Sequence, residues 1–150
     1  KIEKINSMIS NCCIGVDVIA GFPSETEEDF LKTYNFLESL EVSYLHVFSY
    51  SERENTKAIF IKNKVSESIK QDRRKTLVSL SDSKRDSFIN LNLGRSSNIL
   101  FESFDEGYVS GLTENYIKVY VPEDERLINQ IHPVKLMDYS SNIVSGDIIH

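Results

Sequence analysis

The sequence predicts an α/β fold followed by an all-β fold, and three observations lead to this prediction. Residues 15–30 combine a short apolar strand, a tight Gly/Pro loop and a capped helix, which together form a β-loop-α unit. A second strand follows at 44–50, and the short connections make a right-handed parallel βαβ unit. Short alternating strands from residue 96 onward are typical of a small, OB-like five-stranded β-barrel. We therefore expect one domain over 1–95 and a second over 96–150.

The chain begins with a short helix and a strand. Residues 1–10 place apolar side chains at helical spacing, namely Ile2, Ile5, Met8 and Ile9. Residues 14–20 are apolar and rich in β-branched side chains, so we expect a strand that is buried on both faces. Gly21 and Pro23 then end this strand.

A capped helix leads to the second strand. Thr26 and Asp29 have the spacing of a capping box, which predicts a helix over 27–39. Ligands of parallel α/β folds bind at the carboxyl ends of the strands. The loops 21–26 and 51–58 both leave those ends and are the first candidate site.

A long basic helix is expected over 66–93, with Ser66 as its N-cap and Gly94 just beyond its end. The region 62–95 is net basic in a chain whose total formal charge is −6. It is a candidate phosphate-contacting surface, although a run of charge is also the ordinary solvent face of a helix. The side chains expected to contact RNA are Lys70, Arg73 and Arg74.

Five short strands are expected in the second domain, at 97–104, 108–113, 116–121, 133–137 and 143–149. In the third strand, alternation points Ile117, Val119 and Val121 to the core and Tyr116, Lys118 and Tyr120 to the opposite face. Two aromatic rings that flank a lysine suit base stacking and phosphate contact, whereas simple coverage of the sheet is an equally good interpretation.

Composition bounds the class of protein. The 150 residues are 40% hydrophobic and 27% charged, with no apolar run of membrane-spanning length. Cys12 and Cys13 are adjacent and cannot form an ordinary disulfide framework, which favours a reducing, cytoplasmic setting. The acidic total argues against a general nucleic-acid binder. The chain starts at Lys1 and has the character of a piece of a longer protein.

Three blocks of the sequence resemble the tRNA methylthiotransferases, radical enzymes that use S-adenosylmethionine and [4Fe-4S] clusters. Residues 15–30 resemble the signature Asp-x-Ile-x-Gly-Phe-Pro-Gly-Glu-Thr, and residues 46–58 resemble the loop Tyr-Ser-x-Arg-x-Gly-Thr-x-Ala. Residues 101–102 and 111–119 resemble the family's C-terminal RNA-binding barrel, called TRAM. The runs 12–17 and 113–119 lean towards the branch that acts on threonylcarbamoyladenosine in tRNA.

The resemblance implies a function for almost the whole chain. The chain would be the C-terminal part of the partial (β/α) radical-SAM barrel, followed by the TRAM barrel. The parent enzyme would cleave S-adenosylmethionine reductively and add a methylthio group to a modified adenosine in the tRNA anticodon loop, with an electron donor as a further partner. The resemblance places cofactor-binding residues at Ile19, Gly21, Glu25, Phe48, Tyr50, Ser51 and Arg53 and assigns no catalytic residue.

The sequence also departs from the family pattern. Ser24 and Asn55 stand where the family usually has Gly, and Asn tolerates a positive φ. The family's Cys-x-x-x-Cys-x-x-Cys cluster motif is absent, so we expect no metal site in this chain and interpret Cys12 and Cys13 as packing residues. A non-catalytic RNA-binding fragment is therefore the alternative function. An unrelated phosphate-binding α/β domain ranks last, because loop 21–24 has one glycine.

Three further side chains have two interpretations each. We favour a buried structural carboxylate for Asp17 and a core histidine for His46, and Glu25 is as well explained as a helix cap as a ligand contact. We also expect self-association of the chain, because a two-stranded remnant of a barrel exposes unpaired edges and apolar faces. The residues expected on those faces are Val16, Val18, Leu45 and Val47.

Overall fold

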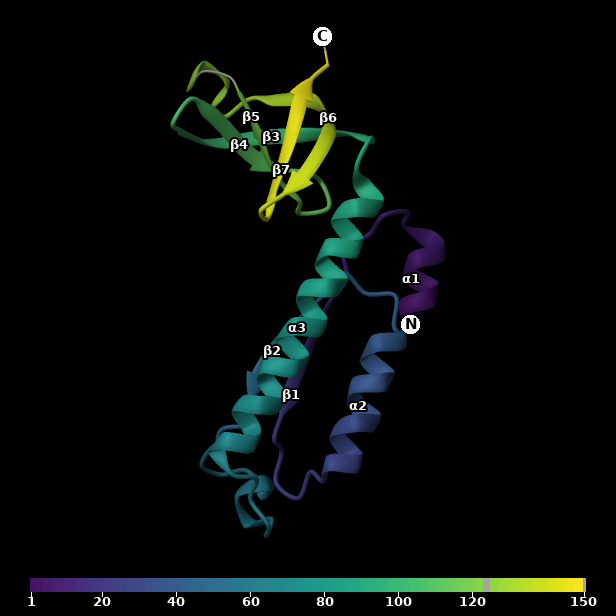
Figure 1. The fold of residues 1–150 in the computed structure, drawn as a ribbon, viewed down its shortest axis with the longest axis vertical. Coiled ribbons are helices and arrows are strands. Elements are labelled where there is room, and N and C mark those ends of the chain that lie inside the picture. Colours follow the sequence, from purple (N-terminus) through teal and green to yellow (C-terminus); the bar gives the residue numbers. More distant parts are fainter. Residues whose placement is uncertain (123–124, 150) are drawn as a thin grey trace. The chain divides into compact units, whose positions relative to one another are not determined.

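A computed structural model of the chain describes residues 1–122 and 125–149, and its elements form two compact units (Figure 1). The first unit contains Lys1–Met8 and Ile14–Arg85, and the second contains Ile9–Cys13 and the chain from Asp86 onward. The fold class predicted from the sequence, α/β followed by a small five-stranded barrel, is confirmed.

The first unit is a parallel βαβ unit preceded by a short helix. Strands β1 (Gly15–Ala20) and β2 (Tyr44–Ser49) pair in parallel over their whole length, from Gly15 with Tyr44 to Ala20 with Ser49. The predicted capping box starts α2, since Thr26 Oγ1 accepts from the Asp29 N–H at 3.1 Å and Asp29 Oδ2 accepts from the Thr26 N–H at 3.1 Å. The elements are α1 (Ile2–Met8), β1 (Gly15–Ala20), α2 (Glu27–Ser39) and β2 (Tyr44–Ser49).

The two faces of this sheet differ. One face packs into the core of the first unit, which also holds Phe30, Leu37 and Leu77. The opposite face is exposed, so the prediction that the first strand is buried on both faces is wrong. Because side chains alternate along a strand, the residues predicted on exposed apolar faces all lie on the covered face instead. These residues are Val16, Val18, Leu45 and Val47.

A short 3-10 helix, η1 (Lys57–Phe60), precedes the long helix α3 (Glu67–Asn92). Leu77 and Leu80 belong to the first core, and the Ser81 hydroxyl bonds both the N–H and the carbonyl of Leu45, at 2.8 and 2.9 Å. The last turns of α3 pack Phe88 and Ile89 against the second core. Packing therefore divides the units inside α3, between Arg85 and Asp86, rather than at its end.

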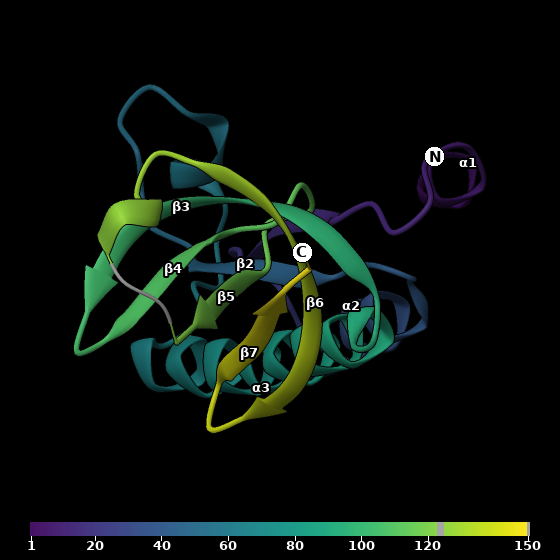
Figure 2. The same ribbon diagram turned by 90° about the horizontal axis from the view of Figure 1, so that it is seen from above.

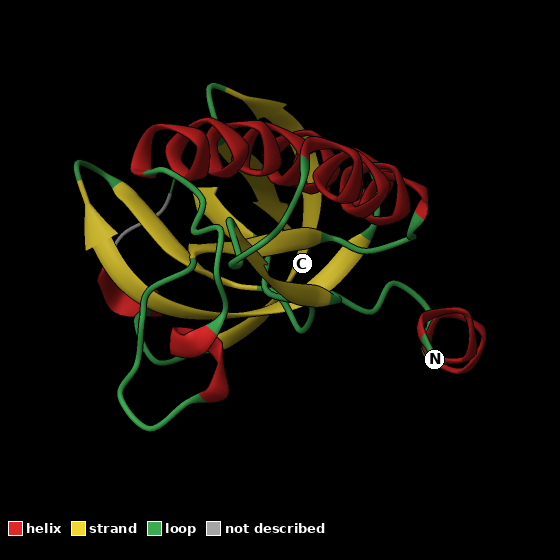
Figure 3. Ribbon diagram, turned by 90° about the horizontal axis from the view of Figure 1, so that it is seen from below, coloured by secondary structure: helices red, strands yellow, loops and turns green. Residues whose placement is uncertain are grey.

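The second unit is a closed barrel in the order β3-β4-β5-β7-β6, and β6 pairs with β3 to close it (Figure 2 and Figure 3). The β5–β7 pairing is parallel and the others are antiparallel. Breaks in register between Phe101 and Ser103, and between Leu136 and Asp138, give the bends that a small barrel needs. The elements are β3 (Ser96–Asp105), β4 (Tyr108–Leu112), β5 (Lys118–Val121), η2 (Glu125–Leu127), β6 (Ile131–Ser140) and β7 (Ile143–Ile148).

Candidate cofactor loop and RNA-binding surface

An ion-pair cluster holds the loop that follows β1. Glu25 Oε2 accepts from the Gly21 N–H at 2.9 Å and from Arg73 Nη1 at 2.6 Å. Arg73 also donates to the Glu25 carbonyl and to Glu27 Oε2, both at 3.1 Å. The side chains of Arg73 and Glu25 are only 6% and 12% exposed. Glu25 therefore joins the loop to α3 through its carboxylate, a role that neither sequence interpretation described.

Lys70 fills the space beside Gly21. A Cβ at Gly21 would collide with Lys70 Cγ, and the φ of Gly21 is +78°. The ammonium of Lys70 donates to Glu67 at 2.7 Å and lies 5.6 Å from the ring centroid of Tyr50. The Tyr50 ring in turn meets Phe22 edge-on, with centroids 5.2 Å apart. The space beside Gly21 is thus occupied by the chain's own lysine.

The predicted basic face of α3 needs a correction. Lys70 and Arg73 are buried, so they cannot form an exposed phosphate-contacting surface in this structure, whereas Arg74 is exposed. The spacing of Lys70, Arg73, Leu77 and Leu80 is that of a core-facing helical stripe. That signal was present in the sequence. Glu25 and Glu27 pair with Arg73, and Glu67 of α3 pairs with Lys70, so each buried cation has an acidic partner. The RNA-binding role of Arg74 stays a prediction.

Ile19 and Phe48 are partners in the β1–β2 register and lie on the exposed face, 55% and 52% exposed. They offer an apolar surface at the carboxyl ends of the strands. Ser51 and Arg53 are exposed in the following loop, where Thr56 Oγ1 donates to the Arg53 carbonyl at 2.8 Å. Four of the seven expected cofactor contacts are therefore accessible in the first unit, and their role stays a prediction.

The polar residues of the same face are also exposed. Asp17 is exposed rather than a buried carboxylate, and its register partner His46 is exposed rather than a core histidine. Both expectations were wrong, because α2 and α3 pack against the opposite face of the sheet. The His46 ring meets Tyr44 edge-on, with centroids 4.8 Å apart.

The two departures from the family's glycines keep a glycine-like backbone. Ser24 has φ +69° and Asn55 has φ +64°, both in the left-handed region. The expected positive φ at Asn55 is confirmed. Ser24 is held by two hydrogen bonds, since its hydroxyl donates to the Lys62 carbonyl at 2.8 Å and its N–H to the Asn63 carbonyl at 2.9 Å.

The described residues do not fit an iron–sulfur cluster. Over residues 1–122 and 125–149, no group of three or more His, Cys, Asp or Glu side chains is placed to hold a metal ion. Cys12 and Cys13 are half-buried in the second unit, and neither is part of a disulfide in the part of the chain that the structure describes. Adjacent cysteines also lack the ligand spacing that such clusters use.

The outer face of β5 carries Lys118 and Tyr120, and the Lys118 ammonium lies 5.1 Å from the Tyr120 ring centroid. Val119 and Val121 point into the core, as alternation predicted. Sequence reasoning missed the neighbouring residues of β4 and β3. Ser110 pairs with Tyr120 across the strands, but it is buried, and its hydroxyl lies 2.8 Å from the hydroxyl of Ser103. This outer face is the candidate RNA-binding surface.

Tyr116 does not belong to that strand. It lies in the loop before β5 with φ +63°, and the residue is 73% exposed. Thr113 closes the loop, since its N–H donates to the Ile117 carbonyl and its Oγ1 accepts from the Ile117 N–H, both at 2.9 Å. The prediction of one stripe of Tyr116, Lys118 and Tyr120 is therefore wrong for Tyr116, because this turn displaces it from the strand.

No helix of the described chain is long and apolar enough to cross a membrane. No family model matches the sequence.

Individual relatives are nevertheless similar to the chain. The threonylcarbamoyladenosine tRNA methylthiotransferase MtaB of Aquifex aeolicus is 42% identical over 120 residues, covering 78% of this chain and 28% of that protein. The tRNA-2-methylthio-N(6)-dimethylallyladenosine synthase of Protochlamydia amoebophila is 34% identical over 151 residues, covering 99% and 34%. The MtaB protein of Bacillus subtilis is 34% identical over 142 residues, covering 91% and 32%.

The chain spans about a third of the length of the curated relatives that it matches. The match to the Protochlamydia amoebophila enzyme covers 99% of the chain, so it includes the loops after β1 and β2 and most of the barrel. The family resemblance drawn from three sequence blocks is confirmed. Over the part that it spans, the chain belongs to the tRNA methylthiotransferase family.

Proposed function

We propose that this chain is the C-terminal part of a radical-SAM tRNA methylthiotransferase, made of the end of the partial (β/α) barrel and a TRAM barrel. The observation that carries the proposal is the 34% identity over 151 residues to an enzyme of this family. The order of the two folds, a parallel βαβ unit before a closed five-stranded barrel, agrees with it. The parent enzyme would work in the cytoplasm with an external electron donor.

We propose threonylcarbamoyladenosine in the tRNA anticodon loop as the modified nucleoside. Two relatives named for this activity support the choice, at 42% and 34% identity. A relative named for the dimethylallyladenosine reaction covers more of the chain, so the substrate needs its own test. Expression of the whole reading frame in a strain without either enzyme, followed by nucleoside analysis of its tRNA, identifies the product. Methylthio-dimethylallyladenosine as the product would contradict the assignment.

In this proposal the first unit borders S-adenosylmethionine, which supplies a carbon radical when it is bound. Ile19 and Phe48 offer exposed apolar surface of the kind that an adenine ring covers. Arg53 is an exposed guanidinium that can bind a carboxylate through two hydrogen bonds. Glu25 and Arg73 act on the loop itself and keep the Gly21 N–H in place.

The barrel binds tRNA in this proposal, through the Lys118 and Tyr120 face. The exposed Arg74, in the first unit, is proposed separately as a phosphate contact. Lys118→Ala should weaken tRNA binding and reduce the slope of log K against log salt by about 1, as expected for one lost phosphate contact. The matched control is Lys135→Ala, which removes an exposed lysine from β6. Equal effects of the two variants would show that bulk charge, not this face, binds tRNA.

An alternative function is a non-catalytic RNA-binding module, and the adjacent pair Cys12–Cys13 favours it for the chain by itself. Anaerobic reconstitution of the chain with iron and sulfide tests this point. We expect no stoichiometric [4Fe-4S] absorbance, because clusters of this kind use four cysteine thiolates and the chain has two cysteines. A stoichiometric cluster would show that the chain holds ligands of its own.

A further inference from the structure

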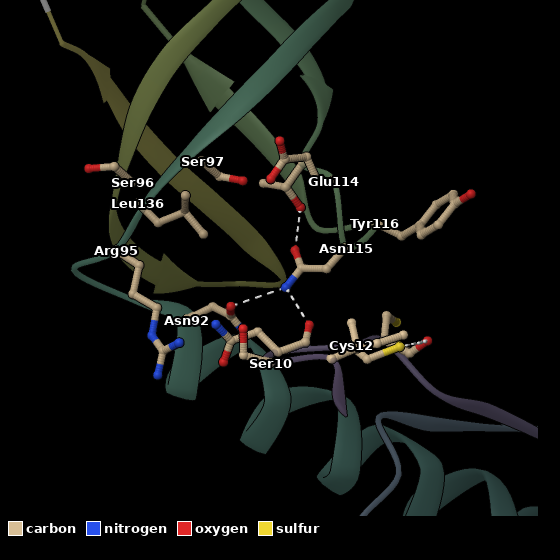
Figure 4. Close-up of a pocket in the computed structure, with 14 residues that line it drawn as sticks. Ser10, Cys12, Asn92, Arg95, Ser96, Ser97, Glu114, Asn115, Tyr116 and Leu136 are labelled. Atoms are coloured by element: carbon tan, nitrogen blue, oxygen red, sulfur yellow. Dashed lines mark hydrogen bonds between the residues drawn. The ribbon is translucent and has the colours of Figure 1, made fainter. Parts of the chain in front are cut away.

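The second unit contains a hollow of about 430 Å³ beside the β4–β5 loop (Figure 4). This volume falls in the range of about 300–1,000 Å³ that is typical of small-molecule sites. All of its lining residues belong to the second unit, and they come from residues 9–13, the end of α3, the start of β3, the β4–β5 loop and β6. Ile9 and Leu136 are the large aliphatic residues of the lining, whose accessible surface is part polar and somewhat more apolar. The hollow therefore suits a ligand that combines a flat apolar surface with hydrogen-bonding groups.

Asn115 forms the fixed floor of the hollow. Its Nδ2 donates to the Asn11 carbonyl and to Asn92 Oδ1, both at 3.1 Å, and its Oδ1 accepts from Thr113 Oγ1 at 2.7 Å (Figure 4). Asn92 is itself buried and donates to the Phe88 carbonyl at 2.8 Å. Both N–H donors of Asn115 are thus used inside the protein, which holds the segment 9–13 against the barrel. The site is built before any ligand arrives.

The rim of the hollow carries groups that face solvent. Arg95 lies on one side of Asn115 and Tyr116 on the other, and Glu114 lies above it with Ser97 (Figure 4). Arg95, Glu114 and Tyr116 are all exposed, so ligand binding would not have to break a buried contact. The guanidinium of Arg95 can contact a phosphate, and the carboxylate of Glu114 can accept hydrogen bonds from base N–H groups. The exposed ring of Tyr116 offers a surface on which a base can stack.

We infer that this hollow and its rim take an unpaired stretch of an RNA strand, with one base stacked on Tyr116 and a phosphate of the same stretch on Arg95. The inference rests on the proposed function, since it specifies how the barrel would hold tRNA. It also gives Tyr116 a role apart from the Lys118 and Tyr120 face. Unpaired bases are the parts of RNA that proteins read by stacking and by hydrogen bonds to base edges.

Binding of unmodified tRNA to the 150-residue chain, measured by fluorescence anisotropy at several salt concentrations, tests the inference. Tyr116→Asn removes the ring but keeps a residue that tolerates a positive φ, and it should weaken binding about 5-fold to 150-fold. Tyr116→Phe keeps the ring and should bind like the wild type. Arg95→Ala should weaken binding and lower the salt slope by about 1. Tyr108→Ala and Lys135→Ala are the matched controls on β4 and β6, expected within 2-fold of the wild type.

A second measurement tests directly whether RNA binds at the hollow. The side-chain amide resonances of Asn92 and Asn115 should shift when an anticodon stem-loop RNA is added to labelled protein. The inference is overturned if Tyr116→Asn or Arg95→Ala binds tRNA as tightly as the wild type does. It is also overturned if added RNA shifts neither side-chain amide resonance. Either result would leave the proposed binding of tRNA by the barrel intact. A wild-type chain that binds no tRNA at all overturns both the inference and the proposed role of the barrel.

Discussion

Replacement of Arg73 by alanine should unfold the first unit more easily while leaving the barrel unchanged. The substitution removes three hydrogen bonds, two to Glu25 and one to Glu27, and the contact of the guanidinium with the Phe30 ring, 5.2 Å away. Removing one partner of a buried ion pair costs about 3–5 kcal/mol, because the other charge stays buried without its partner. We expect about 3 kcal/mol for Arg73→Ala, at the lower end of that range. The reason is that Glu25 retains the Gly21 N–H as a donor.

The assay is native-state hydrogen exchange, which reports on each unit separately. The amides of Ala20 and Leu45 should lose protection by that amount in Arg73→Ala, whereas the amide of Val119 in the barrel should not change. The matched control is Arg74→Ala, which removes the neighbouring exposed arginine and should cost within about 0.5 kcal/mol.

A double substitution separates the charge effect from the loss of packing. Arg73→Met with Glu25→Gln removes both charges and keeps most of the volume, so it should recover part of the loss measured for Arg73→Ala. A loss below about 1 kcal/mol in Arg73→Ala, or equal losses in the two arginine variants, would refute the description of this cluster as a buried support of the loop.

Three further predictions follow from the same unit. Hydrogen bonds from the Thr26 hydroxyl and N–H hold the pKa of the Asp29 carboxyl below its usual value of 3.8. The ionised carboxylate therefore stabilises the fold fully above pH 3.8, and this contribution disappears as the pH falls through the folded-state pKa. Asp29→Asn should make the free energy of urea unfolding less dependent on pH in acid, and an unchanged pH profile would contradict this. Ser24→Ala should be less stable than Ser24→Gly by about 1 kcal/mol, because both lose the hydroxyl bond but only alanine keeps the unfavourable left-handed backbone; equal melting curves would contradict this. We also predict that the chain self-associates through the exposed sheet face, so that Ile19→Lys with Phe48→Lys should give a smaller species in light scattering, and a wild-type monomer at high concentration would contradict it.

Local signals in the sequence predicted the secondary structure well. The helix expected over 27–39 has those bounds, because the Thr26 and Asp29 capping box is a short-range feature. The long helix begins and ends within one residue of its prediction for the same reason, with Gly94 at φ +77° just past its end. Alternation in β5 likewise identified the core side of the strand.

Long-range contacts explain the errors. Nothing local in α3 shows that the partner of Arg73 is Glu25, 48 positions earlier in the chain, so its charge suggested a solvent face. The covered face of β1 depends on where α2 and α3 pack, which the strand's own residues do not specify. Tyr116 was wrongly assigned to the strand, because Thr113 hydrogen-bonds the preceding residues into a turn. An alternating sequence does not predict such a turn.

The three left-handed positions of the signature loops differ in what they will accept. At Ser24 and Asn55 the requirement concerns the backbone angle, so any residue that reaches φ near +65° can replace the family's glycine. At Gly21 a second requirement is added, because Lys70 occupies the place of a side chain. The three positions of the motif therefore differ in how strictly they require glycine. A search pattern for distant family members should allow Ser or Asn at the positions of Ser24 and Asn55 and require glycine only at the position of Gly21.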